Sequence, residues 1–158
     1  LYEGVTYDGV AYRESADESL LVLGGDAAGY TFALAQANAL TNLPTSGVAT
    51  YAGTNMIGSR DGLFGEVGTF SMLADFANGR VALEGTTPSS SISANGLRIN
   101  DSKGTFVGDR GTLTVNGISQ PASIVGAFSG DEAFGVSGIY LDNDADGSGP
   151  EYVGAFDG

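Results

Sequence analysis

The stretch "GTFSMLADFANGRVAL", residues 68–83, determines the fold class expected for this chain. Apolar side chains recur at every second position on both sides of its centre, at Phe70, Met72, Ala74 and Phe76 and again at Val81 and Leu83. This spacing places them on one face of a β-strand. Asn78-Gly79, between the two runs, is a dipeptide typical of tight hairpins. The stretch therefore predicts two antiparallel strands that bury the same face.

Similar segments continue to the end of the chain. From Ser46 to Gly158 we count eight of them, separated by turn residues, as is typical of an all-β barrel or sandwich. Small residues alternate with large ones on several inward faces, which favours strands bent around a barrel. The sequence predicts an all-β, eight-stranded antiparallel up-and-down barrel over residues 46–158. The expected core contains Phe70, Met72, Phe76, Val81, Leu83, Leu97, Ile99, Ile124 and Phe128.

The first 45 residues differ from the rest. They hold three further apolar segments and predict an N-terminal strand-rich extension over residues 1–45, with Pro44 near the join because proline cannot lie in the middle of a sheet. Within the barrel, "TPSSSISANG", residues 87–96, is interpreted as a loop that leads into a strand.

Composition excludes several function classes. The 158 residues include 19 acidic and 6 basic ones, which gives a net charge of −13. The basic residues are scattered singly, so no stripe of cations could neutralise a nucleic-acid backbone, and we expect no nucleic-acid partner. Without histidine or cysteine the chain has no zinc site, no His-ligated haem and no Ser-His-Asp or Cys-His system. We expect no enzymatic activity and no catalytic residue, and no apolar run is long enough to span a membrane.

The stretch "LDNDADGSGPEY", residues 141–152, resembles the first half of a calcium loop. Asp142, Asp144 and Asp146 stand at positions 1, 3 and 5, and a glycine follows at position 6. Val153 stands at position 12, where a bidentate glutamate is required, so any calcium site here would be weak, with a Kd on the order of 10⁻⁴–10⁻³ M. The favoured interpretation is an exposed acidic connection between the last two strands, dispensable for the fold, with no metal and no cofactor.

Three other features have both a functional and a structural interpretation. The loop at residues 59–68 carries Leu63-Phe64, which could be an apolar tip for a partner or could fold back over the barrel mouth. The tyrosines could line a ligand cavity, but eight strands leave room only for side chains. The acidic pairs at Glu14/Asp17/Glu18 and Asp131/Glu132 are interpreted as solvated turn residues rather than as a catalytic pair.

Several motifs, in this order, resemble the β-barrel domain of the transferrin-binding protein B family. They are "ATYAG" (49–53), "GTFSMLADFANGRVAL", "LRIND" (97–101), "GTFVGD" (104–109), "GAFSGDEAFGVSGIYLD" (126–142) and the terminal "YVGAFDG" (152–158). The resemblance implies an eight-stranded barrel beside a strand-rich handle. It also implies a protein that acts outside the cell, often on the surface of Gram-negative bacteria, and that binds transferrin, haem, haemoglobin or another partner. Because the family binds through variable loops, no ligand-binding residue carries over.

The leading hypothesis is an extracellular or cell-surface binding module that presents loops to a protein partner or a haem-type solute. The alternative is a structural subunit of a bacterial surface layer or filament. In that case the N-terminal segment would pair with the sheet edge of a neighbouring subunit, and the chain would self-assemble.

Overall fold

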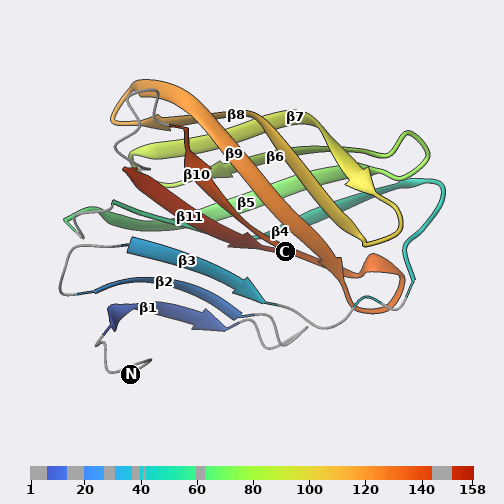
Figure 1. The fold of residues 1–158 in the computed structure, drawn as a ribbon, viewed down its shortest axis with the longest axis horizontal. Helices are drawn as coiled ribbons and strands as arrows, with labels where there is room; N and C mark the ends of the chain where they lie inside the picture. The colour runs from blue at the N-terminus through green and yellow to red at the C-terminus, as the bar shows by residue number, and fades with distance from the viewer. Residues whose placement is uncertain are drawn as a thin grey trace.

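A computed structural model of the chain describes the backbone of residues 7–13, 20–26 and 31–36, and both backbone and side chains of residues 40, 42–59, 63–143 and 151–158. The described residues form strands with almost no helix, and no helix among them is long and apolar enough to cross a membrane. The strands run obliquely along the long axis of the molecule (Figure 1).

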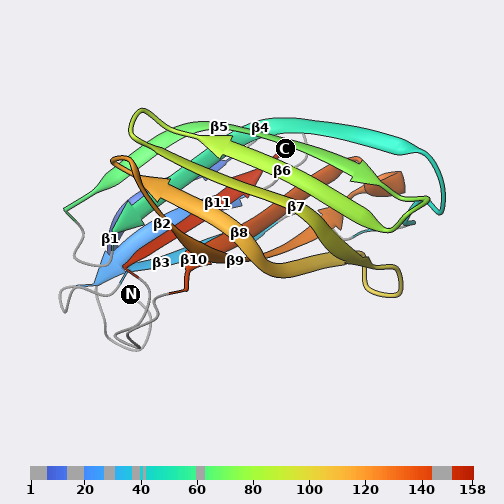
Figure 2. The same cartoon turned by 90° about the horizontal axis from the view of Figure 1, so that it is seen from above.

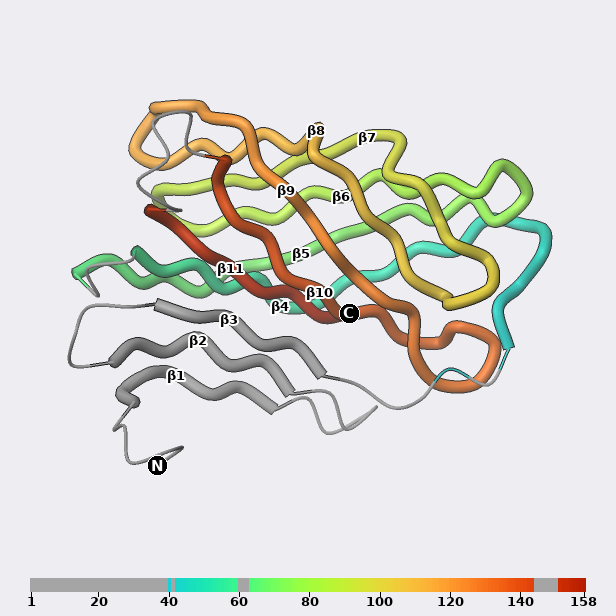
Figure 3. Tube along the Cα trace, viewed as in Figure 1, coloured from blue at the N-terminus to red at the C-terminus, as the bar shows by residue number. Residues whose placement is uncertain are grey.

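Eight strands close into an antiparallel barrel, as the sequence predicts. Each strand pairs with its neighbour in the chain, and the last pairs with the first, which completes an up-and-down barrel (Figure 3). The strands are β4 (Val48–Ser59), β5 (Gly65–Asp75), β6 (Arg80–Thr86), β7 (Ser90–Asn100), β8 (Thr105–Val115), β9 (Ile118–Ser129), β10 (Gly135–Asp142) and β11 (Tyr152–Asp157).

A separate three-stranded sheet precedes the barrel. It consists of β1 (Tyr7–Arg13), β2 (Leu20–Asp26) and β3 (Thr31–Gln36), in that order, and β3 lies beside β10 and β11 (Figure 1). The three strands agree with the three apolar segments seen in the sequence. The division into two domains at residue 45 stays a prediction.

Aromatic rings fill the barrel. Phe70 stacks on Phe156 with ring centroids 4.4 Å apart, and Phe128 packs against Phe106 at 5.4 Å and Phe76 at 5.3 Å. Eight of the nine expected core residues are buried, and the ninth, Ile99, is partly buried against the same cluster. The interior is thus occupied by side chains, as expected for eight strands.

Two details of the strands differ from the prediction. Residues 90–96 are not a loop but the first half of β7, because Ile92 and Ala94 alternate inward between their neighbours β6 and β8. Alternation in "FGVSGIYLD", residues 134–142, predicts that Phe134 shares the inward face of Val136 and Tyr140, but Phe134 is 75% exposed. The preceding 3₁₀ turn, Asp131–Ala133, has positive φ at its last two residues, and this bend keeps Phe134 out of β10.

Candidate functional site

The wall of the barrel has a bulge on β7. Opposite β6, Val81 pairs with Leu97 and Ala82 pairs with Asn95, so Gly96 is an extra residue. Gly96 has a φ of +72°, a conformation that residues with a side chain rarely adopt. The bulge interrupts the alternation of the strand, and Asn95 and Gly96 are both exposed although they are consecutive.

A second bulge lies on β8, opposite β9. The register between β8 and β9 shifts by one residue between Gly108 and Gly111, so Asp109 and Arg110 share the space that one residue would normally take. Both side chains are exposed, again as consecutive residues. The bulge of β7 therefore disturbs its pairing with β6, and the bulge of β8 disturbs its pairing with β9.

Between the two bulges, the ladder that joins β7 to β8 is interrupted. Pairing stops after Ser93 and Thr112 and resumes, in the same register, at Arg98 and Val107. The four residues between these pairs on each strand are not paired with one another. The result is a hollow of about 260 Å³ in the outer wall. Its lining residues belong to β6, β7 and β8, the strands that lie side by side toward the viewer in Figure 2.

Leu97 separates this hollow from the barrel interior. Its side chain is only 2% exposed, and a Cβ added to Gly108 would lie 2.4 Å from the Leu97 Cδ2 atom. Leu97 therefore covers the backbone of Gly108 and belongs to the main hydrophobic core. The hollow is a depression in the wall rather than a channel into the core.

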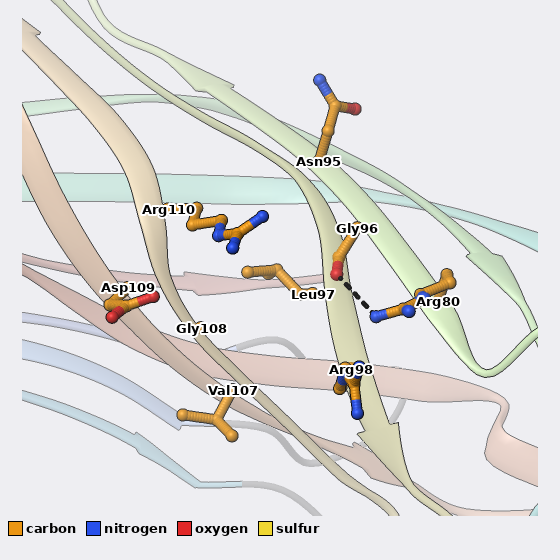
Figure 4. Close-up of a pocket in the computed structure, with 9 residues that line it drawn as sticks. All are labelled: Arg80, Asn95, Gly96, Leu97, Arg98, Val107, Gly108, Asp109 and Arg110. Carbon is orange, nitrogen blue, oxygen red and sulfur yellow. Dashed lines mark hydrogen bonds between the residues drawn. The ribbon is translucent and has the colours of Figure 1, made fainter.

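Three arginines from three strands surround the hollow (Figure 4). Arg80 reaches from β6 toward β7, where its Nη1 donates a hydrogen bond of 3.2 Å to the carbonyl of Gly96. Arg98 lies on β7, and Arg110 reaches from β8 toward the same strand. Among the side chains that the structure describes, none of these guanidinium groups forms an ion pair, although Asp109 also lines the hollow.

These arginines are among the basic residues that stand singly along the sequence. Arg80, Arg98 and Arg110 are separated along the chain, but they make up half of the six basic residues and meet at one place in space. The sequence signal is the break in alternation at Asn95-Gly96 and at Asp109-Arg110, which marks bulges only once the strands are aligned.

The calcium candidate Asp142 is buried rather than exposed. It ends β10 with 1% of its surface accessible, and its Oδ2 accepts hydrogen bonds from the Gln120 side-chain amide at 2.8 Å and from the Glu151 N–H at 3.2 Å. The stretch does connect the last two strands, but the expectation of exposure is wrong at Asp142, because its carboxylate ties the two ends of the connection together. Asp144 and Asp146 lie outside the described residues.

No group of three potential metal-ligating side chains occurs among the residues that the structure describes. The hydrogen bonds from Gln120 and Glu151 both go to the Oδ2 atom of Asp142. Weak calcium binding by Asp142, Asp144 and Asp146 stays a prediction.

Asp142→Ala is expected to lower the free energy of unfolding by about 1–3 kcal/mol, because it leaves the Gln120 amide and the Glu151 N–H without their acceptor. Urea denaturation followed by tyrosine fluorescence measures this loss. Asp101→Ala, at an exposed turn, is the matched control and is expected to change stability by less than about 0.5 kcal/mol. Equal stability of the two variants would show that Asp142 is dispensable after all.

The loop between β4 and β5 has both an exposed apolar residue and a residue that folds back onto the barrel, so each of its two interpretations holds for one residue. Leu63 is 89% exposed, whereas Phe64 is partly buried and makes an edge-on contact with the Tyr152 ring at 5.9 Å. One side chain thus faces solvent and the next folds back onto the barrel.

Asp131 and Glu132 are exposed, as expected for solvated turn residues, and Glu14, Asp17 and Glu18 lie outside the described residues.

A cluster of hydroxyl groups surrounds Glu66 at one rim of the barrel. The Ser89 hydroxyl donates to the Glu66 carboxylate at 2.6 Å, the Ser89 N–H donates at 3.0 Å, and the Thr87 hydroxyl donates as well. These hydrogen bonds lower the pKa of Glu66. The bond from the Ser89 hydroxyl has the largest effect, followed by the bond from the Thr87 hydroxyl. A carboxylate stabilised in this way is a poor general base, and its role is to hold the β6–β7 loop against β5.

Tyr51 and Tyr140 are buried in the core of the barrel. The Tyr51 hydroxyl donates to the carbonyl of Ala133 at 2.7 Å, and the Tyr140 hydroxyl donates to Asn55 Oδ1 at 3.0 Å. Burial raises the pKa of Tyr51 to about 12 and also raises the pKa of Tyr140. Both rings belong to the main core cluster.

The two buried tyrosines predict a loss of stability at high pH. Their folded pKa values lie above the unfolded value of about 10, so their contribution is fully present below pH 10 and is lost as pH rises toward 12. The melting temperature is expected to fall between pH 10 and 12. Tyr51→Phe is expected to make this fall shallower, and an unchanged slope would contradict the assignment.

Comparison with known proteins shows a likeness of structure at low sequence identity. No family model and no curated protein matches the sequence. Among solved structures, isotype 1 transferrin binding protein B from serogroup B Neisseria meningitidis superposes with a TM-score of 0.68 and 15% identity. Transferrin binding protein B from Actinobacillus pleuropneumoniae H49 gives 0.66 and 14%, and a surface lipoprotein gives 0.65 and 14%.

The likeness extends over nearly the whole chain. It covers 99% of this chain in the Neisseria comparison, 95% in the Actinobacillus comparison and 96% in the surface lipoprotein comparison. The chain spans 34% of the Neisseria protein and 79% of each of the other two. The resemblance seen in the sequence motifs is therefore confirmed as a resemblance of fold.

Proposed function

We propose that this chain is a non-enzymatic binding module that acts outside the cell or on its outer surface and holds a protein partner. The observation that carries the proposal is the position of the hollow, on the outer wall of the barrel. Its interior is filled by packed rings, while the outer wall has a hollow with three exposed arginines. A partner would therefore contact the outside of the barrel.

The fold likeness supports both the class of function and the location. Two of the similar structures are named for binding transferrin, and the third is named a surface lipoprotein. Transferrin is the first candidate partner for this chain. A haem-type solute is a weaker candidate, because the chain has no histidine and the described interior is occupied by side chains.

The chemistry of the described side chains also supports a binding role. Nucleophile systems that depend on histidine or cysteine cannot form. Ser89 donates a hydrogen bond to Glu66, and the lowered pKa of Glu66 makes this carboxylate a weak proton acceptor.

Biolayer interferometry with immobilised transferrin, in its iron-loaded and iron-free forms, tests the proposal. Saturable binding to transferrin and none to immobilised serum albumin is the expected result. Two parallel measurements address the alternatives: a haem titration followed by the Soret band, and light scattering over a range of protein concentrations. Haem binding or concentration-dependent assembly, without transferrin binding, would replace the proposal.

A further inference from the structure

We propose that the hollow between β7 and β8 is a binding site for carboxylates, and that its ligand is an acidic segment of a protein partner. This inference rests on the proposed function for the nature of the partner. The site itself is inferred from the bulges, the arginines and the charge around them.

The local charge of the hollow is opposite to that of the molecule. Three arginines and one aspartate line it, so its formal charge is 3 − 1 = +2. The whole chain carries −13, and half of its basic residues are gathered here. A net negative charge repels anions from the molecule as a whole, whereas three arginines gathered in one hollow attract carboxylates locally.

The arginines are arranged to receive oxyanions. A guanidinium group presents five N–H donors in a planar fork that matches a carboxylate, and the Arg80 fork is oriented by its bond to the Gly96 carbonyl. That bond uses one donor of the five and leaves the others for a ligand. Because Arg98 and Arg110 form no ion pair with the described side chains, a ligand would not have to displace an existing partner.

The hollow also has an apolar part that favours an acidic side chain over a small free anion. Val107 is exposed and lines the hollow beside the arginines. The methylene groups of a glutamate could cover Val107 while its carboxylate meets a guanidinium, whereas sulfate or phosphate would leave this apolar surface in water. Two neighbouring acidic residues on one peptide would match the +2 charge.

Isothermal titration calorimetry with an N-acetylated, C-amidated tetraglutamate peptide at low ionic strength tests the site. Wild-type protein is expected to bind the peptide, and the affinity is expected to fall as salt is added. Arg98→Gln and Arg110→Gln are each expected to weaken binding about tenfold, the loss typical of one charge-assisted hydrogen bond. Lys103→Gln removes the same charge from the exposed β7–β8 turn and is expected to weaken binding less than about twofold.

A second pair of variants tests the sign of the local charge. Asp109→Asn removes the carboxylate that lines the hollow and is expected to strengthen peptide binding several-fold. Asp101→Asn changes the net charge equally, but lies in the turn and is expected to have little effect. If both aspartate variants change the affinity equally, or if Lys103→Gln weakens binding as much as the two arginine variants, the peptide responds only to the net charge of the protein. Either result would overturn the site.

Other ligands separate the remaining possibilities. Tighter binding of sulfate or phosphate than of the peptide would overturn the assignment to an acidic segment, and so would tighter binding of sialyllactose, whose carboxylate is carried by a sugar. Transferrin binding that is unchanged in Arg98→Gln and Arg110→Gln would overturn this inference and leave the proposed function intact. Peptide binding that depends on the arginines, without transferrin binding, would support the site and require another protein partner.

Discussion

Replacing Phe156 by alanine is expected to lower the free energy of unfolding by about 3–5 kcal/mol, because the change empties a packed position at the barrel seam. Phe156 is fully buried on β11, the strand that closes the barrel against β4. Its ring stacks on Phe70 at 4.4 Å and lies 6.4 Å from the Phe106 ring. The substitution removes contacts to β5 and β8 together, from opposite sides of the barrel.

Urea denaturation followed by circular dichroism measures this change. Phe134→Ala is the matched control, since it removes the same ring from an exposed position and is expected to cost less than about 0.5 kcal/mol. A Phe156→Ala protein as stable as the control would mean that the barrel is not closed around these rings.

Gly138→Val is expected to destabilise the protein by about 3 kcal/mol, at the upper end of the usual cost of overpacking a core. Gly138 on β10 pairs with Phe156 on β11, and the ring of Phe156 lies over it. A Cβ at this position would stand 2.3 Å from the Phe156 Cζ and 2.6 Å from the Val125 carbonyl oxygen. The ring could move, but the oxygen belongs to the backbone of β9, so the strands themselves would have to shift.

Gly65→Ala on β5 is the control for this second change. An added Cβ there meets nothing closer than 4.0 Å, and the substitution is expected to be neutral or to stabilise by about 0.4–1 kcal/mol through the unfolded state. Thermal unfolding of both variants provides the comparison. If Gly138→Val melts at the wild-type temperature, the close approach of the Phe156 ring to β10 is wrong.

The strands could be predicted from the sequence because alternation and turn chemistry are local. Asn116-Gly117 joins β8 to β9 as a two-residue turn with φ values of 50° and 80°, the hairpin conformation that this dipeptide favours. Residues 90–96 resemble a loop in composition because serines occupy outward positions of β7, although Ile92 and Ala94 alternate inward as in a strand. The exposure of Phe134 could not be predicted, because the bend before it depends on positive φ at Glu132 and Ala133, residues with no such preference.

The arginine hollow could not be predicted in the same way. Its parts lie on β6, β7 and β8, and each looks ordinary within its own strand: an exposed cation, a glycine, an acidic residue. Only the register between neighbouring strands reveals that the bulges at Gly96 and at Asp109-Arg110 stand at the same height. Likewise, Asp142 looked like a solvated turn residue because its hydrogen-bond partner Gln120 is distant in the sequence.

The most direct test of an outward-facing carboxylate site is an amide ¹H–¹⁵N spectrum of the wild-type protein, recorded during titration with the tetraglutamate peptide. The expected result is a set of saturable shifts confined to residue 80 and to residues 94–98 and 107–111, with the amides of Gly96, Gly108 and Gly111 among them. Core amides next to Phe70 and Phe156 are expected to stay unchanged. Shifts confined to the loops at the barrel ends, or scattered over the surface without saturation, would contradict the assignment.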